Sequence, residues 1–251
     1  MAGALERPER TPRPAAGRGG PRRRPAAKPP PLAYTSPIDL LAGPAQAEPL
    51  LDELVRLGTV VRLTNPSQWD AVVTAILRRS VPAGQAARKH GAFFAAYGRG
   101  FRTEAGEFAL VPSPGTVLAL SDGQFDAVGA AVDRMALRAV AEAYLDRGGQ
   151  WTIRGPACLA KKLAEVPYLG SWAAAVAAAD VTGDFSVFPH GDPAVRAGAG
   201  RVLRDGLVAE DGFEEQWHRW APTRAQLHAL TLFTLTWAGE EQAAATPPAA
   251  P

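Results

Sequence analysis

The chain has 251 residues, 47% of them hydrophobic and six of them Trp, which is enough apolar surface for one core. Its single cysteine, Cys158, excludes an internal disulfide framework, a cysteine-ligated iron–sulfur cluster and a multi-cysteine zinc site, and favours a reducing compartment. The N-terminus resembles no secretory signal, and no apolar run is long enough to cross a bilayer. These features predict a soluble cytoplasmic protein with no membrane partner.

The formal net charge of +2 is unevenly distributed along the chain. Residues 1–32 carry eight basic and two acidic side chains with almost no large apolar ones, which predicts a disordered basic arm. Residues 33–251 hold 19 basic and 23 acidic groups, a balance of −4. The Pro- and Ala-rich tail at 243–251 is also expected to be disordered, so the predicted folded domain spans 33–242.

The first half of this domain is predicted to be mainly helical after a strand or edge segment at 57–63. Ser67 can cap a helix, with Asp70 three residues on as the acid of a capping box. A second helix is expected to begin at Pro82 and to end before Gly98. The apolar residues of the first helix recur at helical spacing: Trp69, Val72, Val73, Ile76 and Leu77.

The second half continues the helical pattern. The stretch 98–114 is rich in turn residues and is expected to contain a short strand at 108–111. Residues 121–144 are expected to form one or two helices interrupted near Gly129. Further helices are predicted at 156–165, 172–179, 193–203 and 225–237.

The most informative segment is a helix, a tight apolar turn and a second helix. The turn is Val166–Gly170, and a turn this short directs backbone N–H groups and a helix N-terminus towards one point. Such an arrangement can bind an anion such as a DNA phosphate independently of the DNA base sequence. Beyond the second helix, Asp192 stands immediately before Pro193 at the start of another predicted helix.

This segment resembles the helix-hairpin-helix DNA glycosylase superfamily, in which a hairpin of the form LPGIGxxTA precedes an aspartate that begins a helix. WDAVVTAILRR at 69–79 is similar to an early helix of the family, and LSDGQFDAVGAAVDRMALRAVAEAY at 120–144 to its middle region. WHRWAPTRAQLHALTLFTLTW at 217–237 resembles the ending typical of the 3-methyladenine, or alkyl-base, branch. The resemblance covers about 60–238 and implies a mainly α, two-lobed helical fold with a DNA-binding cleft.

The resemblance also implies which residues contact DNA. It places backbone groups of the hairpin and the following helix, together with an arginine after Asp192, on the phosphates, and it allows a monovalent cation at the hairpin but no other cofactor or metal. The residues predicted to bind DNA are Val166, Tyr168, Leu169, Gly170, Ser171 and Arg196.

Asp192 is the predicted catalytic residue. Hydrolysis of an N-glycosidic bond passes through a sugar cation, which a nearby carboxylate can stabilise while it orients a water, as in glycoside hydrolysis. On spacing alone, Asp192 is better explained as the cap of the helix that begins at Pro193, and the resemblance reverses this preference. The two roles are compatible, because a capping carboxylate is held rigidly.

The substrate pocket is predicted to include Trp172, His190 and Trp69. Bifunctional family members carry at the position of Trp172 a lysine that attacks the sugar, so a Trp there implies a monofunctional enzyme without lyase activity. Trp172 could stack on an alkylated base or could be a core aromatic, and both interpretations stay open. Trp69 and the other tryptophans are also readily explained as core residues, and His190 as a buried histidine.

Base flipping requires a side chain that fills the gap left in the duplex. The resemblance places this wedge at Ser80, Val81 or Pro82, and the first two are the preferred candidates. The sequence differs from the family at Arg79, where glutamine is usual, at Ser80, which is small, and at Tyr168, which replaces the first glycine of the hairpin.

We therefore predict a monofunctional, monomeric glycosylase that excises damaged, alkylated bases from double-stranded DNA in base excision repair and is associated with the nucleoid. The alternatives are a non-catalytic lesion-binding protein of the same fold and a helical protein-interaction module without a DNA role. Residues 147–204 carry seven basic and four acidic groups, so the predicted DNA face is locally basic, and the arm at 1–32 would add non-specific affinity.

Overall fold

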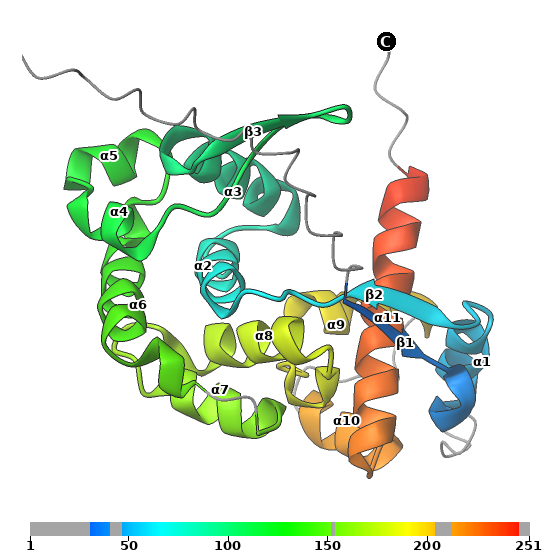
Figure 1. Ribbon diagram of the computed structural model, residues 1–251. Helices are drawn as coiled ribbons and strands as arrows, with labels where there is room; N and C mark the ends of the chain where they lie inside the picture. The colour runs from blue at the N-terminus through cyan, green and yellow to red at the C-terminus, as the bar shows by residue number, and fades with distance from the viewer. Residues whose placement is uncertain (1–30, 41–46, 152–153, 204–211, 246–251) are drawn as a thin grey trace, which may run out of the picture. The chain divides into compact units, whose positions relative to one another are not determined.

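A computed structural model describes residues 31–40, 47–151, 154–203 and 212–245 (Figure 1). The predicted basic arm lies outside these ranges except for its last two residues, and so does the predicted tail after residue 245. Most of the described residues lie in helices, as the sequence predicted. The regular structure begins at Leu32 and ends at Ala245, slightly beyond the predicted bounds of 33 and 242.

The N-terminal elements form a small two-stranded sheet with one helix beside it. Strand β1 (Leu32–Thr35) pairs antiparallel with β2 (Val60–Leu63), with Leu32 opposite Leu63. The strand expected within 57–63 is thus confirmed, whereas its partner β1 was not predicted because it is only four residues long. A 3-10 turn, η1 (Pro37–Leu40), and helix α1 (Glu48–Val55) lie between the strands.

Helices α2 (Gln68–Arg78) and α3 (Ala83–Tyr97) follow the predicted pattern. Ser67 caps α2 through a hydrogen bond that its hydroxyl accepts from the N–H of Asp70, at 3.2 Å. Pro82 is the N-cap of α3 and Gly98 its C-cap. The periodic apolar face of α2 is buried, so this face positions the α2–α3 connection against the core.

The segment after α3 forms a β-hairpin and three helices. The predicted strand at 108–111 lies two residues earlier, as β4 (Gly106–Ala109), because Gly106 takes a φ of +130° at the turn and pairs with β3, which was not predicted. The break expected near Gly129 is confirmed, with φ at +69°. The elements are β3 (Gly100–Thr103), α4 (Pro114–Ala119), α5 (Asp122–Ala127), η3 (Ala131–Asp133), α6 (Arg134–Arg147) and η4 (Gly148–Gln150).

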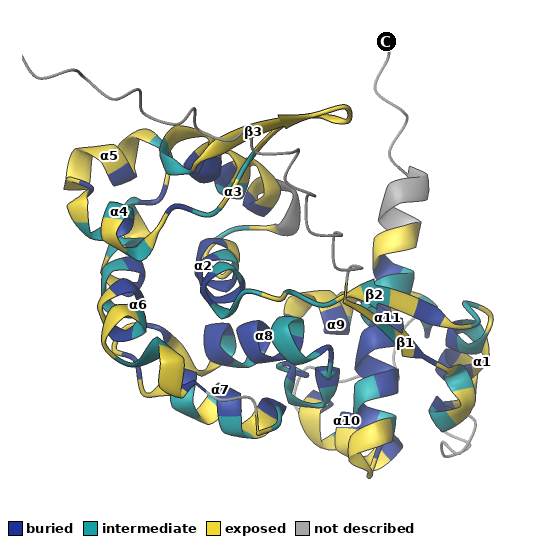
Figure 2. Cartoon of the chain, viewed as in Figure 1, coloured by how far each residue is buried: buried dark blue, intermediate teal, exposed yellow. Residues whose placement is uncertain are grey.

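The predicted helix–turn–helix is present as α7 (Pro156–Ala164) and α8 (Gly170–Thr182). Helix α8 is apolar around most of its circumference, and small side chains let it pack closely against both α2 and α7. A 3-10 turn, η5 (Phe185–Val187), leads to α9 (Pro193–Val202). Figure 2 shows α8 as a largely buried element.

The C-terminal part consists of α10 (Phe213–Trp220) and the long helix α11 (Arg224–Ala245), of which α10 was not predicted as a helix. Helix α11 packs against α9, η1 and η5. His228 of α11 connects two of its neighbours, since one ring nitrogen lies 2.9 Å from the Thr35 hydroxyl and the other accepts the N–H of Phe185 at 2.9 Å.

The described elements from Pro31 onward therefore form two groups joined by α2, α7 and α8. One group contains α3 to α6 and the β3–β4 hairpin, and the other contains β1, β2, α1 and α9 to α11 (Figure 1). The connection between α2 and α3, the start of α8 and the start of α9 meet at one cavity, which is described next.

Candidate functional site

A cavity of about 770 Å³ brings together residues that are more than 100 positions apart in the sequence. Asp192 and Trp172 line it together with Ser80 and Val81, so four of the residues predicted for the site do share one cavity. The others complete a wall that carries two arginines. The lining residues are Arg78, Arg79, Ser80, Val81, Pro82, Ala86, Trp172, Asp192, Pro193 and Ala194.

Asp192 is held by one hydrogen bond to each carboxylate oxygen. Oδ1 accepts the backbone N–H of Ala194 at 2.8 Å, which makes Asp192 the N-cap of α9. Oδ2 accepts the indole N–H of Trp172 at 2.8 Å. The residue is only 7% exposed, and it nevertheless lines the cavity. The capping role is therefore confirmed, and the same contacts fix a carboxylate at the cavity wall.

Trp172 links this carboxylate to the hairpin. It lies in the first turn of α8, two residues after Gly170, and is half-buried. Its indole N–H is engaged by Asp192, and the residue lines the cavity. The structure thus supports the pocket interpretation over a purely core role, since a half-buried ring borders the open volume.

The hairpin between α7 and α8 divides into a buried and an exposed part. Val166 and Leu169 are buried, and their N–H groups donate to the carbonyls of Leu163 and Val166. Gly170 and Ser171, at the exposed start of α8, have no side-chain cap. The first N–H groups of a helix lack intrahelical acceptors, so those of Gly170 and Ser171 are the hairpin donors best placed for an anion.

Tyr168 takes a φ of +64°, which makes it the single non-glycine with positive φ in the described ranges. A side chain in this left-handed region costs about 1 kcal/mol relative to glycine. We expect Tyr168→Gly to raise the free energy of unfolding by about 1 kcal/mol relative to Tyr168→Ala. Both variants lose the exposed ring, so urea denaturation of the pair isolates the backbone contribution; equal stabilities would contradict it.

Arg79 occupies the carbonyl side of the same hairpin. Its Nη1 donates to the carbonyl oxygens of Tyr168, at 2.8 Å, and Leu169, at 2.9 Å. Both oxygens accept from the same nitrogen, so the guanidinium occupies the point on which they converge. A monovalent cation bound to both oxygens would have to displace this guanidinium.

Ser80 is tied to a buried ion pair that the sequence did not reveal. Lys89 of α3 forms an ion pair with Asp133, and both side chains are buried. The Ser80 hydroxyl accepts from Lys89 Nζ at 3.0 Å and donates to Asp133 Oδ1 at 3.3 Å. These contacts hold the hydroxyl towards the ion pair, while the residue itself is exposed and lines the cavity. Val81, which is half-buried, and Pro82 line the same cavity, so all three predicted wedge positions border it.

Three predicted site residues lie elsewhere. Trp69 is a core residue, 4% exposed, whose indole N–H donates to the Pro112 carbonyl at 2.8 Å, so the pocket prediction for it is wrong. Arg196 is half-buried one turn beyond Asp192 and does not line the cavity. His190 is also absent from the lining, because it is buried and packs edge-on against His218, with ring centroids 4.9 Å apart.

Burial and, to a smaller extent, the neighbouring His218 lower the pKa of His190 to about 4, against the opposing effect of Glu214. The unfolded chain binds this proton with a pKa near 6.5, so the stabilising effect is present above pH 6.5 and is lost as the pH falls towards 4. We expect the free energy of unfolding to be about 2 kcal/mol lower at pH 5 than at pH 7 because of His190. Urea titrations of wild type and His190→Gln at both pH values check this; the same pH dependence in both proteins would contradict it.

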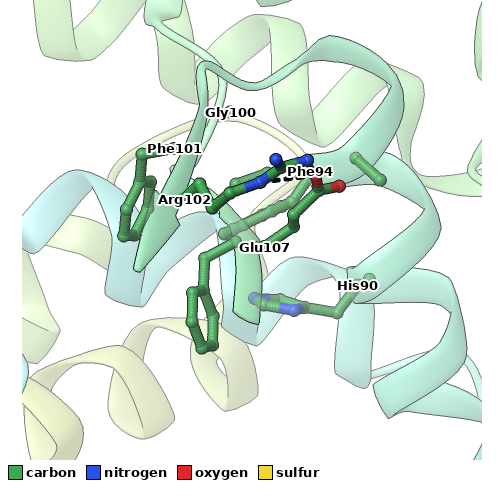
Figure 3. A pocket seen from close by; sticks show the side chains of 10 residues that line it. His90, Phe94, Gly100, Phe101, Arg102 and Glu107 are labelled. Carbon is green, nitrogen blue, oxygen red and sulfur yellow. Dashed lines mark hydrogen bonds and ion pairs between the residues drawn. The ribbon is translucent and has the colours of Figure 1, made fainter. Parts of the chain in front are cut away.

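A second cavity of similar volume lies between α3 and the β-hairpin and shares no lining residue with the first. Figure 3 shows its aromatic walls, where Phe101 stacks on Phe108 with ring centroids 5.7 Å apart and His90 packs on Phe94 at 3.9 Å. Its charged pair, Arg102 and Glu107, is joined across the two strands. Burial is the largest of the effects that lower the pKa of His90 in this lining.

Within the described ranges, no group of three or more His, Cys, Asp and Glu side chains is arranged to hold a metal ion. In the same part of the chain, no helix is both long enough and apolar enough to cross a membrane.

Several solved structures share this fold at low sequence identity. The match to the 3-methyladenine DNA glycosylase of Archaeoglobus fulgidus covers 81% of this chain and 70% of that enzyme, with a TM-score of 0.61 and 16% identity. The Schizosaccharomyces pombe 3-methyladenine DNA glycosylase, in complex with abasic DNA, matches 84% and 98%, with a TM-score of 0.61 and 17% identity.

An 8-oxoguanine glycosylase/lyase of Clostridium acetobutylicum, in complex with double-stranded DNA containing cytosine opposite 8-oxoguanine, matches 78% of this chain and 67% of its own, with a TM-score of 0.59 and 12% identity. No protein-family model and no curated protein sequence matches the chain. The structural matches include both the 3-methyladenine and the 8-oxoguanine enzymes. The chain therefore has the fold of the helix-hairpin-helix DNA glycosylases.

Proposed function

We propose that this protein is a monofunctional DNA glycosylase that hydrolyses the N-glycosidic bond of alkylated bases in double-stranded DNA. The observation that carries the proposal is Asp192, a carboxylate fixed at a cavity wall by Ala194 and Trp172, close to a hairpin with exposed N–H groups. The relatives of this fold named above supply the substrate class, because two of them are 3-methyladenine glycosylases.

In this mechanism the carboxylate of Asp192 stabilises positive charge on the sugar. As the bond from C1′ to the base breaks, charge develops on the sugar ring, and a fixed anion stabilises this state more than the neutral substrate. The Ala194 and Trp172 hydrogen bonds fix the carboxylate before the reaction, so little reorganisation is needed. The base leaves with the electrons of the C1′–N bond, a water beside the carboxylate attacks C1′, and the proton that the water loses passes to Asp192 and then to solvent.

An alkylated purine is the substrate that this cavity suits best. Such a base often carries a positive charge, which favours stacking on the indole of Trp172 and makes the base a better leaving group. The positively charged base would need no general acid, and the lining residues offer none apart from arginines. Excision here therefore depends on electrostatic stabilisation and on selection of a base that leaves readily.

The proposed lack of a lyase step is supported by the same lining, which among the described residues contains no lysine. Lys89, three residues beyond Ala86 in α3, is buried in its ion pair with Asp133. An amine held as a charged ion pair is not a nucleophile, so it cannot form a Schiff base with the sugar.

Glycosylase profiling tests the proposal directly. Duplexes containing 3-methyladenine, 7-methylguanine, hypoxanthine, 8-oxoguanine or a bulky adduct are incubated with the enzyme, and released bases are separated from abasic DNA. We expect release of alkylated purines, with strand breaks only after alkali treatment. Absence of base release from the whole panel would contradict the proposal, and strand cleavage without alkali would contradict its monofunctional part.

The second candidate is a lesion-binding protein without catalysis. The observation that favours it is the pair of hydrogen bonds that join the Ser80 hydroxyl to Lys89 and Asp133, because these bonds oppose insertion of Ser80 into the duplex. Tight binding to alkylated duplex without turnover on any lesion would favour this function over the first.

A further inference from the structure

Arg79 borders the cavity and also contacts the hairpin, which lies far from it in the sequence. It follows the last residue of α2 and lines the cavity of Asp192, and its guanidinium also contacts the hairpin 89 residues further on. Both hairpin contacts use Nη1, to the carbonyl oxygens of Tyr168 and Leu169. The residue is exposed, and among the described residues the remaining guanidinium N–H groups have no hydrogen-bond partner.

These contacts have an electrostatic consequence for any anion that approaches the hairpin. Two carbonyl oxygens directed towards one point create a negative potential, which repels a phosphate that comes close to the turn. A guanidinium on these oxygens reverses the local sign, and its planar fork can donate in two directions at once. The protein uses Nη1, and the N–H groups of Nε and Nη2 are left for solvent or a ligand.

We propose that Arg79 is a built-in cation of the hairpin, which bridges the Tyr168 and Leu169 carbonyls to a DNA phosphate and makes phosphate binding independent of a bound alkali metal ion. This inference rests on the DNA binding proposed above and names the residue that anchors the phosphate. The bonds from Arg79 to both carbonyls support it, since a free cation bound to these oxygens would have to displace the guanidinium.

The left-handed backbone at Tyr168 fits this role. Its φ of +64° is unfavourable for a tyrosine, and the same residue supplies one of the two carbonyls that Arg79 contacts. The guanidinium therefore stabilises the turn conformation that exposes the start of α8. Arg79 acts as a positioning residue for the hairpin and as a direct contact for the phosphate.

The test measures affinity, by fluorescence anisotropy, for a duplex with a non-cleavable abasic analogue. Wild type, Arg79→Gln and Arg79→Lys are compared in potassium, sodium and tetramethylammonium chloride at equal ionic strength. The control is Arg56→Gln, which removes the same charge from an exposed ion pair with Glu53 on α1. Thermal denaturation of each variant verifies that the fold is retained.

We expect wild type and Arg56→Gln to bind equally well in all three salts. Arg79→Gln should bind about tenfold more weakly in tetramethylammonium, because a charge-assisted phosphate contact is lost, and its dependence of log affinity on log salt should be flatter by about 0.9. Potassium or sodium should restore part of its affinity, since the freed carbonyls can take an alkali ion. Arg79→Lys should be intermediate, because one ammonium lacks the fork.

Two results would overturn this inference alone. The first is a wild type that needs potassium or sodium to bind, and the second is an Arg79→Gln variant that matches Arg56→Gln in affinity and salt slope. A purely structural role would lower the stability of Arg79→Gln without changing that slope, and would count as the second result. A wild type that binds no duplex, damaged or intact, would overturn the proposed function as well.

Discussion

Asp192→Asn is expected to lower base excision by at least about 100-fold while leaving affinity for abasic-analogue DNA unchanged or higher. The substitution removes the negative charge that stabilises the sugar cation, and losses of this size follow when one preorganised electrostatic contact is removed from an active site. Binding is preserved because asparagine caps a helix as well as aspartate does, so α9 and the cavity keep their positions. Single-turnover release of 3-methyladenine measures the loss.

The amide of the variant also changes the local hydrogen bonds. Asp192 now accepts from both Ala194 and Trp172, whereas an asparagine has one acceptor oxygen and leaves one of these donors unsatisfied. We therefore expect a reduction of the free energy of unfolding of about 1 kcal/mol, too small to explain a large loss of excision.

The matched control is Asp126→Asn, the same chemical change on the exposed face of α5. It should excise bases at the wild-type rate. If Asp192→Asn excises as fast as Asp126→Asn, Asp192 is only a helix cap and the proposed mechanism is wrong. If both variants and the wild type bind DNA without excision, the lesion-binding alternative is favoured.

Lys89→Met is expected to destabilise the protein by about 3–5 kcal/mol. Its partner Asp133 is fully buried, and without Lys89 its charge stays in the interior with only the Ser80 hydroxyl as a hydrogen-bond donor from this cluster. Removing one member of a buried ion pair costs this much because the other charge is left uncompensated. Urea denaturation followed by circular dichroism measures the change at pH 7.

The double variant Lys89→Met/Asp133→Leu separates the ion pair from the packing around it. Replacement of both charges by apolar side chains removes the uncompensated charge, so its stability should return to within about 1–2 kcal/mol of wild type. Arg102→Met, in the exposed pair with Glu107 on the β-hairpin, should have little effect. A double variant as unstable as Lys89→Met alone would show that the methylene packing of Lys89, rather than the charge pair, stabilises this region.

Features set by neighbouring residues could be predicted from the sequence. The Ser67 cap, the break at Gly129 and the Asp192–Pro193 start of α9 are decided within one helical turn, so the printed residues suffice to locate them. Short elements without such signals were missed. Strand β1 has four residues and depends on its pairing with β2, and α1 has no side-chain cap.

In the candidate site, sequence spacing located the residues that the chain itself brings close together, whereas Ser80 and Val81 were placed at the cavity by the family resemblance alone. The hairpin at 166–170 and Asp192 flank one helix, α8, so their sequence spacing and the family resemblance located them. Trp69 and His190 were misplaced in the pocket because periodicity marks a residue as buried but does not say which side of the core it faces.

The charge pattern shows the same division between local and tertiary information. The sequence by itself determined a helical chain with a locally basic segment at 147–204, a capped Asp192 and a hairpin able to bind an anion. Only the tertiary structure brought Arg79 to the hairpin carbonyls, Trp172 to the carboxylate, and Lys89 to Asp133. The physical reason is that a side-chain hydrogen bond acts over about 3 Å, whereas the partners of Arg79 and Lys89 lie tens of residues away, so packing of α2, α3 and α8 had to decide them.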